Sequence, residues 1–245
     1  MRAGEFVSIV GPSGCGKSTI FNVIAGLLRP TSGEALIDGR SVAGSPGHVG
    51  YMLQKDLLLP WRTIIDNVVL GAELLGENRS AVREQALALM ADFGLQGFED
   101  AWPSRLSGGM RQRAALMRTV LSGRDVLLLD EPFAALDAMT RLLMHEWMLS
   151  IWEEFGRTIV FITHDVDEAI FLSDRVYVMT ARPGRIKAVV NIDLTRPRDY
   201  DVMTTERFAR LKHELLGLIH EELVRAPTGA QQGSAAARPE PGTTV

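Results

Sequence analysis

The sequence has little of what secreted and membrane proteins need. Its 245 residues include a single cysteine, Cys15, which excludes an internal disulfide and fits a reducing compartment. The longest apolar runs, such as 126–129 and 158–163, have the length of strands and are too short to cross a membrane. Met1 and Arg2 lead directly into a strand-like segment, so no signal peptide is expected. We therefore expect a cytoplasmic protein.

An excess of positive charge is also absent. The chain has 26 Lys and Arg residues against 30 Asp and Glu residues, for a net charge of −4. This balance does not indicate a polyanion-binding surface, and nucleic acid is not expected as a partner. With 46% hydrophobic and 23% charged residues, the composition is that of an ordinary globular protein. The length suits one large α/β domain, or one domain with a helical insertion.

The hydrophobic pattern predicts strands and helices in alternation. Strand-like segments cover 5–10, 34–37, 48–52, 126–130, 158–162, 175–179 and 185–192. Helical patterns cover 17–28, 63–75, 80–93, 107–121, 138–155, 166–172 and 205–223. The alternation over the second half predicts a mainly parallel sheet with helices on both faces. A domain over 1–224 is expected, with a helical insertion at about 60–121, followed by a disordered Gly/Pro/Ala-rich tail over 225–245.

The most informative stretch is Gly11–Thr19, which matches the pattern G-x-x-x-x-G-K-[ST] at every fixed position. A glycine-rich turn between a strand and a helix lets backbone N–H groups close around phosphate oxygens, and the helix N-terminus adds its positive dipole end. Lys17 would reach the β- and γ-phosphates, and the Ser18 hydroxyl would ligate Mg²⁺. The alternative is a purely structural glycine turn. The residues predicted to bind the nucleotide are Gly11, Ser13, Gly14, Cys15, Gly16, Lys17, Ser18 and Thr19, with Cys15 as filler in a variable position.

A second stretch, Val126–Pro132, is an apolar strand that ends in two adjacent carboxylates, Asp130 and Glu131. Adjacent side chains of a strand point in opposite directions, so the two carboxylates can serve two roles. Asp130 would belong to the Mg²⁺ shell, and Glu131 would act as general base toward the attacking water. An ordinary turn at a strand end is the alternative when this stretch is taken alone.

The stretch Leu106–Arg113, Leu-Ser-Gly-Gly-Met-Arg-Gln-Arg, closely resembles the signature of the ATP-binding subunits of ABC transporters. Ser107 is an N-cap candidate, and Gly108 and Gly109 leave N–H groups free to approach an anion. The resemblance implies that this helix end contacts the γ-phosphate of ATP held by a partner subunit. Met110 stands where the commonest form of the signature has Gln, a change that leaves the serine and the glycines intact.

Further matches to this family follow in its order along the chain. Gln54 matches the glutamine that contacts Mg²⁺ and water and senses the membrane partner. Asp137, in Ala-Leu-Asp, matches an aspartate carried across the dimer interface, and His164 matches the switch histidine that positions Glu131 and water. The resemblance therefore implies a P-loop NTPase fold that hydrolyses ATP with Mg²⁺ as a head-to-tail homodimer. The other histidines match nothing and are expected to be surface or core residues: His48, His145, His213 and His220.

Some stretches resemble the importers of nitrate, sulfonates and taurine in particular, namely 58–61 with 66–68, the Met110 signature and 178–186. This branch implies uptake of a small anionic solute through separate permease subunits, with a solute-binding protein as an indirect partner. The subunit would lie peripherally on the cytoplasmic face of the membrane. Trp61 follows Gln54 in a region that faces the permease in the family, so it is a docking candidate besides ordinary packing.

The front end departs from the family, because only five residues precede Phe6 and none of them is an aromatic that could stack on adenine. We expect N-terminal antiparallel strands to be truncated, or the start to be assigned too late; a truncation would weaken ATP binding. Two other functions stay open. One is a non-transport ATPase of the same class, although the chain has no second cassette, heptad run or basic surface. The other is a truncated, inactive cassette, although Glu131 and His164 are both present.

Overall fold

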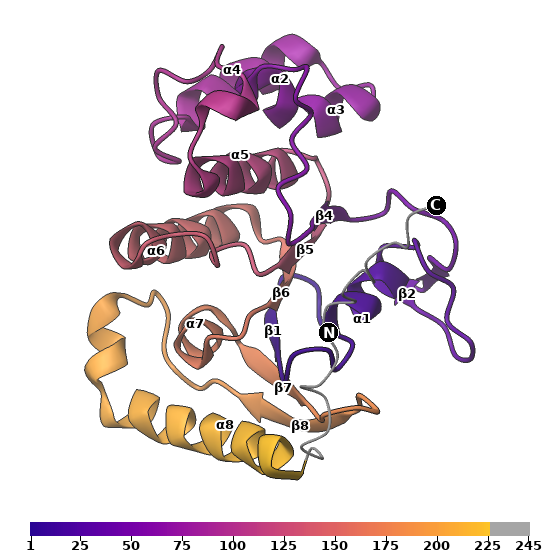
Figure 1. The fold of residues 1–245 in the computed structure, drawn as a ribbon, viewed down its shortest axis with the longest axis vertical. Helices are drawn as coiled ribbons and strands as arrows, with labels where there is room; N and C mark the ends of the chain where they lie inside the picture. The colour runs from indigo at the N-terminus through magenta and orange to yellow at the C-terminus, as the bar shows by residue number, and fades with distance from the viewer. Residues whose placement is uncertain (226–245) are drawn as a thin grey trace, which may run out of the picture.

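The computed structural model describes residues 1–225, which form a six-stranded sheet with helices on both sides (Figure 1). The strand order is β4-β5-β6-β1-β7-β8, and all neighbours are parallel except the β7–β8 pair. The bounds are β1 Phe6–Val10, β4 Gly50–Met52, β5 Val126–Asp130, β6 Thr158–Ile162, β7 Arg175–Met179 and β8 Ile186–Asn191. All five residues of β1 are buried, as expected for a parallel strand covered on both faces. The predicted mainly parallel sheet is confirmed.

The helices cover the sheet unequally. In Figure 1, α1 lies on one side of the sheet, and α5, α6 and α7 lie on the other. Their bounds are α1 Lys17–Ile24, α5 Gly108–Val120, α6 Ala138–Phe155, α7 Val166–Leu172 and α8 Glu206–Arg225. A small antiparallel hairpin, β2 (Leu36–Ile37) with β3 (Arg40–Ser41), lies apart from the main sheet. Among residues 1–225, no helix has the length and apolar character that crossing a bilayer requires.

Three short helices gather with α5 at one end of the molecule (Figure 1): α2 (Ile64–Val68), α3 (Leu70–Leu74) and α4 (Arg79–Leu89). The predicted helix over 63–75 is divided in two at Val69, which lies between α2 and α3. Side-chain oxygens cap two of these helices, since Thr63 accepts from Asp66 N–H and Asn78 accepts from the first turn of α4. These helices fall within the predicted insertion at about 60–121.

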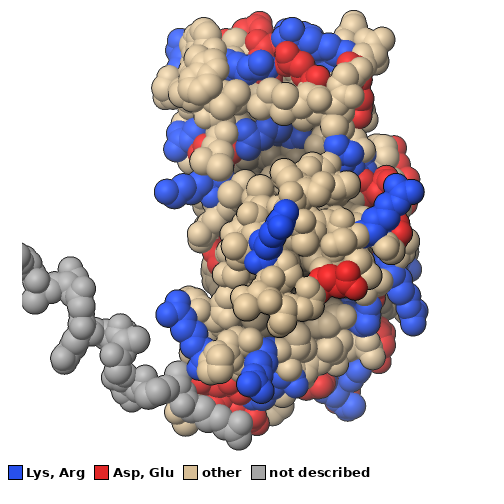
Figure 2. Space-filling model, turned by 90° about the vertical axis from the view of Figure 1, so that its right-hand side faces the viewer, with Lys and Arg blue, Asp and Glu red and all other residues tan. Residues whose placement is uncertain are grey.

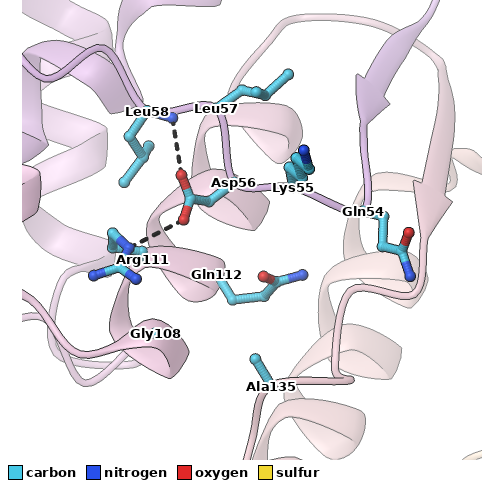
Figure 3. A pocket seen from close by; sticks show the side chains of 9 residues that line it. All are labelled: Gln54, Lys55, Asp56, Leu57, Leu58, Gly108, Arg111, Gln112 and Ala135. Atoms are coloured by element: carbon cyan, nitrogen blue, oxygen red, sulfur yellow. Dashed lines mark hydrogen bonds and ion pairs between the residues drawn. The ribbon is translucent and has the colours of Figure 1, made fainter. Parts of the chain in front are cut away.

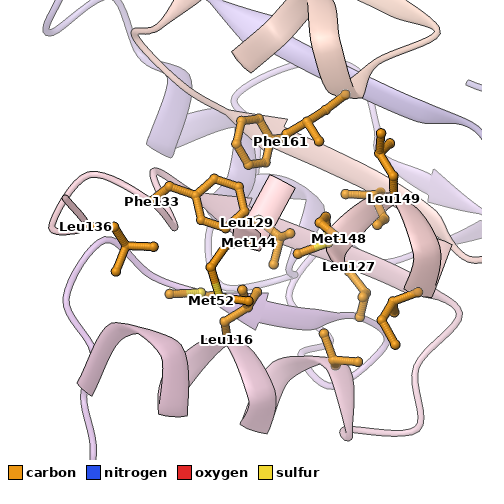
Figure 4. Packing of buried hydrophobic residues seen from close by; sticks show 14 of the residues in the cluster. Met52, Leu116, Leu127, Leu129, Phe133, Leu136, Met144, Met148, Leu149 and Phe161 are labelled. Atoms are coloured by element: carbon orange, nitrogen blue, oxygen red, sulfur yellow. The ribbon is translucent and has the colours of Figure 1, made fainter. Parts of the chain in front are cut away.

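A large apolar core supports the strand ends that carry polar residues (Figure 4). Phe133, directly after β5, packs against Phe161 of β6 with ring centroids 5.6 Å apart, and neither side chain is more than 1% exposed. Met148 of α6 and Leu129 of β5 belong to the same cluster. Because protein interiors are close-packed, this contact holds the ends of β5 and β6 in a fixed relation.

The first helix is shorter than its pattern predicts. The predicted segment 17–28 stays helical only to Ile24, because Gly26 has a φ of 74°. A Cβ on Gly26 would lie 2.4 Å from the Ser45 carbonyl oxygen, so the chain turns there against a second backbone segment. At the C-terminal end of the described residues, α8 extends to Arg225, and the rest of the predicted tail over 225–245 lies outside them.

Candidate nucleotide-binding site

The predicted site residues follow the carboxyl ends of four adjacent strands. Gln54 follows β4, Glu131 follows β5, His164 follows β6, and the phosphate loop follows β1. Parallel strands end at one edge of the sheet, and ligands bind open α/β sheets outside that edge. The strand order therefore brings together residues that are far apart in the sequence.

The phosphate loop has the backbone that its glycines allow. Gly14 has a φ of 75° and Gly16 a φ of 107°, values that favour glycine. The Lys17 ammonium is buried and donates to the carbonyl oxygens of Gly11 at 2.8 Å and Pro12 at 3.0 Å. A hollow of about 320 Å³ opens beside the loop. It is lined by Ser13, Gly14, Gly16, Lys17, Ser18, Thr19, Gln54, Asp130, Glu131 and Arg182.

Asp130 and Ser18 form the pair to which the sequence assigns Mg²⁺. Asp130 is 5% exposed. Burial raises its pKa, and so does the charge of Glu131, whereas a hydrogen bond with Ser18 and the charge of Lys17 lower it; the net shift is upward. A buried carboxylate beside a hydroxyl is an oxygen donor set that suits Mg²⁺. Within residues 1–225 no cluster of three or more His, Cys, Asp or Glu side chains could hold a metal ion.

Glu131 is contacted by both other candidate catalytic residues. Its Oε2 lies 3.3 Å from the Gln54 amide nitrogen and 3.5 Å from His164 Nδ1. Its backbone has a φ of 50°, a left-handed value that is uncommon outside glycine and concentrates at functional sites. The Glu131 N–H donates to the Ile162 carbonyl at 2.9 Å, which holds this turn against β6. Three residues predicted from separate motifs thus meet at one carboxylate.

The signature residues lie elsewhere on the same subunit. Ser107, Gly108 and Gly109 do not line the hollow beside the phosphate loop. Ser107 caps α5 by accepting from Met110 N–H at 3.2 Å, as its N-cap position predicts. Asp137 caps α6 by accepting from Thr140 N–H at 3.0 Å, and its hydrogen bonds with Thr140 lower its pKa.

A second hollow, of about 480 Å³, lies between α5 and the segment that follows β4 (Figure 3). Gly108, Arg111 and Gln54 are among its lining residues, and Asp56 joins its walls by accepting from Arg111 Nε at 3.1 Å. Gln54 lines both hollows. Figure 2 shows a hollow beneath the helical end of the molecule, with Lys and Arg side chains on both sides of it, and acidic and basic side chains are interspersed on the face in view.

The sequence did not single out two residues that the structure brings to this region. Gln112, 6% exposed, donates from its amide to the Glu131 carbonyl at 3.4 Å. Arg182 donates from Nε to the Gly14 carbonyl at 2.7 Å. Neither contact has a local signal, because the partners lie 19 and 168 residues apart. Of the histidines expected to be surface or core residues, His145 is buried, and its Nε2 lies 3.3 Å from Glu168 Oε1. Trp61, the docking candidate, is 70% exposed.

Comparison with known proteins gives one consistent family. The model of the ABC transporter family matches residues 1–134. An uncharacterised ABC transporter ATP-binding protein of Methanocaldococcus jannaschii is 47% identical over 222 residues, which cover 91% of this chain and 82% of that protein. The taurine import ATP-binding protein of Rhizobium johnstonii is 42% identical over 220 residues, which cover 88% of this chain and 84% of that protein.

A solved structure resembles the fold as well. It is the dimeric, post-hydrolysis state of an ATP-binding cassette bound to ADP and phosphate. The TM-score is 0.69 at 29% sequence identity, and the match covers 80% of this chain and 88% of that one. The predicted P-loop α/β fold is confirmed by this likeness together with the parallel sheet described above.

Proposed function

Because this chain belongs to the family of ABC transporter ATP-binding subunits and is an ATPase of that family, we propose that it powers solute uptake. The solute would be a small anion that crosses the membrane through a separate permease. The observation that carries the catalytic part is the meeting of Gln54 and His164 at the Glu131 carboxylate, beside the phosphate loop. The solute class is supported by the taurine importer relative, because taurine carries a sulfonate. Other sulfonates carry the same group, and nitrate shares with it a negative charge spread over oxygen atoms. The subunit would lie peripherally on the cytoplasmic face of the membrane.

The phosphate loop and its neighbours would bind MgATP. The loop N–H groups surround the phosphates, and the Lys17 ammonium exchanges its carbonyl partners for phosphate oxygens. The Ser18 hydroxyl and the Asp130 carboxylate, with the Gln54 amide, would hold Mg²⁺. When bound, this ion would offset the negative charge that develops on the phosphates.

Glu131 would act as the general base. A carboxylate that takes a proton from water must be held within hydrogen-bond reach of it, and Gln54 and His164 fix the position of this one from two sides. The backbone hydrogen bond from Glu131 to Ile162 keeps the turn from relaxing. His164 would in addition meet the γ-phosphate.

The active state would be a head-to-tail homodimer. The loop of one subunit would be completed by Ser107, Gly108 and Gly109 of the other, with Asp137 at the interface. This arrangement is supported by the position of the signature outside the hollow of its own phosphate loop and by the dimeric cassette to which the fold is similar. ATP would close the dimer because the closed state alone completes both sites.

The permease would dock beside the second hollow. Gln54 lines both this hollow and the hollow beside the phosphate loop, and it donates a hydrogen bond to Glu131. A partner bound at the second hollow would therefore contact Glu131 through the Gln54 side chain alone. Exposed Trp61, which follows the same segment, would add an apolar contact. A solute-binding protein would then be an indirect partner.

The first test is Mg²⁺-dependent phosphate release by the purified chain, with Glu131→Gln beside it. We expect the substitution to lower turnover at least 100-fold, because general-base catalysis contributes roughly 10²–10⁴-fold, and to leave ATP binding intact. Binding is measured by calorimetry on the same preparations. Equal turnover of the two proteins would exclude Glu131 as the base, and loss of both binding and turnover would point to a folding defect in place of a catalytic one.

A further inference from the structure

The hairpin end that joins β7 to β8 is a fixed structure. The Thr180 N–H donates to the Arg185 carbonyl at 2.9 Å, and the Thr180 hydroxyl donates to the Pro183 carbonyl at 3.0 Å. The Ala181 N–H donates to the Glu222 carboxylate of α8 at 3.2 Å. The hairpin end is therefore held both internally and from the neighbouring helix.

This hairpin end lies directly on the phosphate loop. A Cβ on Gly184 would lie 1.9 Å from the Cys15 carbonyl oxygen, so only glycine fits between the two backbones. At the start of the loop, a Cβ on Gly11 would lie 3.0 Å from the Met179 carbonyl oxygen. The loop and the hairpin thus approach each other closely at these two points, which places the hairpin backbone between Met179 and Gly184 beside the loop.

Arg182 lies in this part of the hairpin. Its Nε donates to the Gly14 carbonyl at 2.7 Å, and it lines the same hollow as Lys17, Ser18 and Glu131. The guanidinium carries five N–H donors, of which this bond uses one. Within residues 1–225 its terminal nitrogens have no protein partner, and the side chain is exposed toward the hollow.

We propose that Arg182 is a further nucleotide-binding residue, which contacts the phosphate chain with its terminal nitrogens while Nε holds the loop at Gly14. A guanidinium matches phosphate geometry through paired N–H donors, and a charge-assisted bond is stronger than a neutral one. Lys17 supplies one cation from within the loop, and Arg182 supplies a second from a hairpin 168 residues beyond Gly14. The inference rests on the proposed function, since it concerns the same nucleotide site.

The test compares two substitutions on one hairpin. Arg182→Gln removes the guanidinium at the hollow, and Arg185→Gln removes the same charge from a neighbouring exposed arginine that does not line it. ADP affinity is measured by calorimetry with the full-length chain. We expect Arg182→Gln to weaken ADP binding about tenfold, as for a partly exposed charged hydrogen bond, and Arg185→Gln to match the unaltered protein. Equal affinities of the two variants would overturn the proposal.

Inorganic pyrophosphate separates a phosphate contact from mere support of the loop or contact with the nucleoside. If Arg182 contacts the phosphates, Arg182→Gln lowers the affinity for pyrophosphate, obtained as the inhibition constant from its competition with ADP, by the same factor. The defect then shrinks as salt is raised, and Arg182→Lys restores part of the affinity. An unchanged pyrophosphate affinity, or a defect insensitive to salt and unrelieved by lysine, would overturn the phosphate contact. Failure of the unaltered protein to bind ADP at all would instead overturn the proposed function.

Discussion

At Asp130, burial and function oppose each other. The carboxylate is 5% exposed, and its pKa is raised by burial and by the charge of Glu131 more than Ser18 and Lys17 lower it. A carboxyl with a raised pKa in the folded protein destabilises the fold once it is ionised. That cost is present at neutral pH and disappears below the ordinary pKa of about 3.9. Asp130 is thus suited to an ion that restores favourable interactions to its charge.

We therefore expect Asp130→Asn to stabilise the nucleotide-free protein at pH 7 by on the order of 1 kcal/mol, the scale seen when an active-site strain is relieved. Asparagine keeps the acceptor for Ser18 without the buried charge. The gain should shrink as the pH falls through the raised pKa of Asp130 and vanish below about 3.9, where Asp130 becomes protonated in the unfolded state as well. Urea unfolding of both proteins across this pH range measures it, and a variant less stable than the unaltered protein at pH 7 would contradict it.

Glu5 supplies a control of opposite sign. Burial raises its pKa. Hydrogen bonds from Arg175, at 2.6 Å, and from the Arg2 N–H lower the pKa by more than burial raises it, so the net shift is downward. Its stabilising contribution is present above the ordinary glutamate pKa of about 4.3 and is lost as the pH falls through the lowered one. Glu5→Gln should therefore destabilise the protein at pH 7, and the difference should diminish in acid.

Among the elements, glycines divide into those that the fold requires and those that it tolerates. Gly26 ends α1 with a positive φ against the Ser45 backbone. Gly217 lies in the middle of α8 on an exposed face, where a Cβ would meet no atom within 4 Å. The same residue type thus terminates one helix and weakens another.

Gly217→Ala should stabilise the protein by about 0.5–1 kcal/mol, because alanine loses less backbone entropy than glycine in a helix interior. Gly26→Ala should destabilise it, since the new methyl group would meet two backbone carbonyls in a left-handed conformation. Thermal unfolding of the two variants gives the comparison. A rise in Tm for both, or a fall for both, would contradict this account of the two helices.

On the scale of the whole molecule, the residues of the proposed site lie on two surfaces of one subunit. The phosphate loop, Asp130 and Glu131 share one hollow, whereas Gly108 lines another and Ser107 lines neither. Under the proposed function, a subunit that carries half of a site on each of two surfaces would complete it with a second copy in head-to-tail arrangement.

Mixing two inactive variants tests this arrangement. Lys17→Ala removes the phosphate-loop cation, and Ser107→Arg blocks the signature. Each alone should hydrolyse ATP at least 100-fold more slowly than the unaltered protein. A mixed dimer joins the intact loop of one variant to the intact signature of the other, so phosphate release should return in part on mixing. If the mixture stays as inactive as its components while ATP-dependent dimers form, the composite site is excluded.

Much of the fold and of the candidate site could be predicted from local sequence, because the chemistry depends on short motifs. The apolar run of β5 ends in Asp130 and Glu131, and a buried parallel strand needs only such a run to be recognised. The ends of helices were predicted less accurately where a contact with a distant part of the chain sets them. The helix after the phosphate loop ends four residues earlier than its pattern, since Gly26 meets the chain at Ser45.

The sequence by itself determined the family, the kind of chemistry and the four strand ends at which the candidate site residues lie, because each is encoded in contiguous residues. Only the tertiary structure decided that these ends are adjacent, through the strand order β4-β5-β6-β1. It also decided that Arg182 reaches Gly14 and that Gln112 reaches Glu131. Contacts of this kind depend on packing between elements far apart in the chain, which no local pattern of residues encodes.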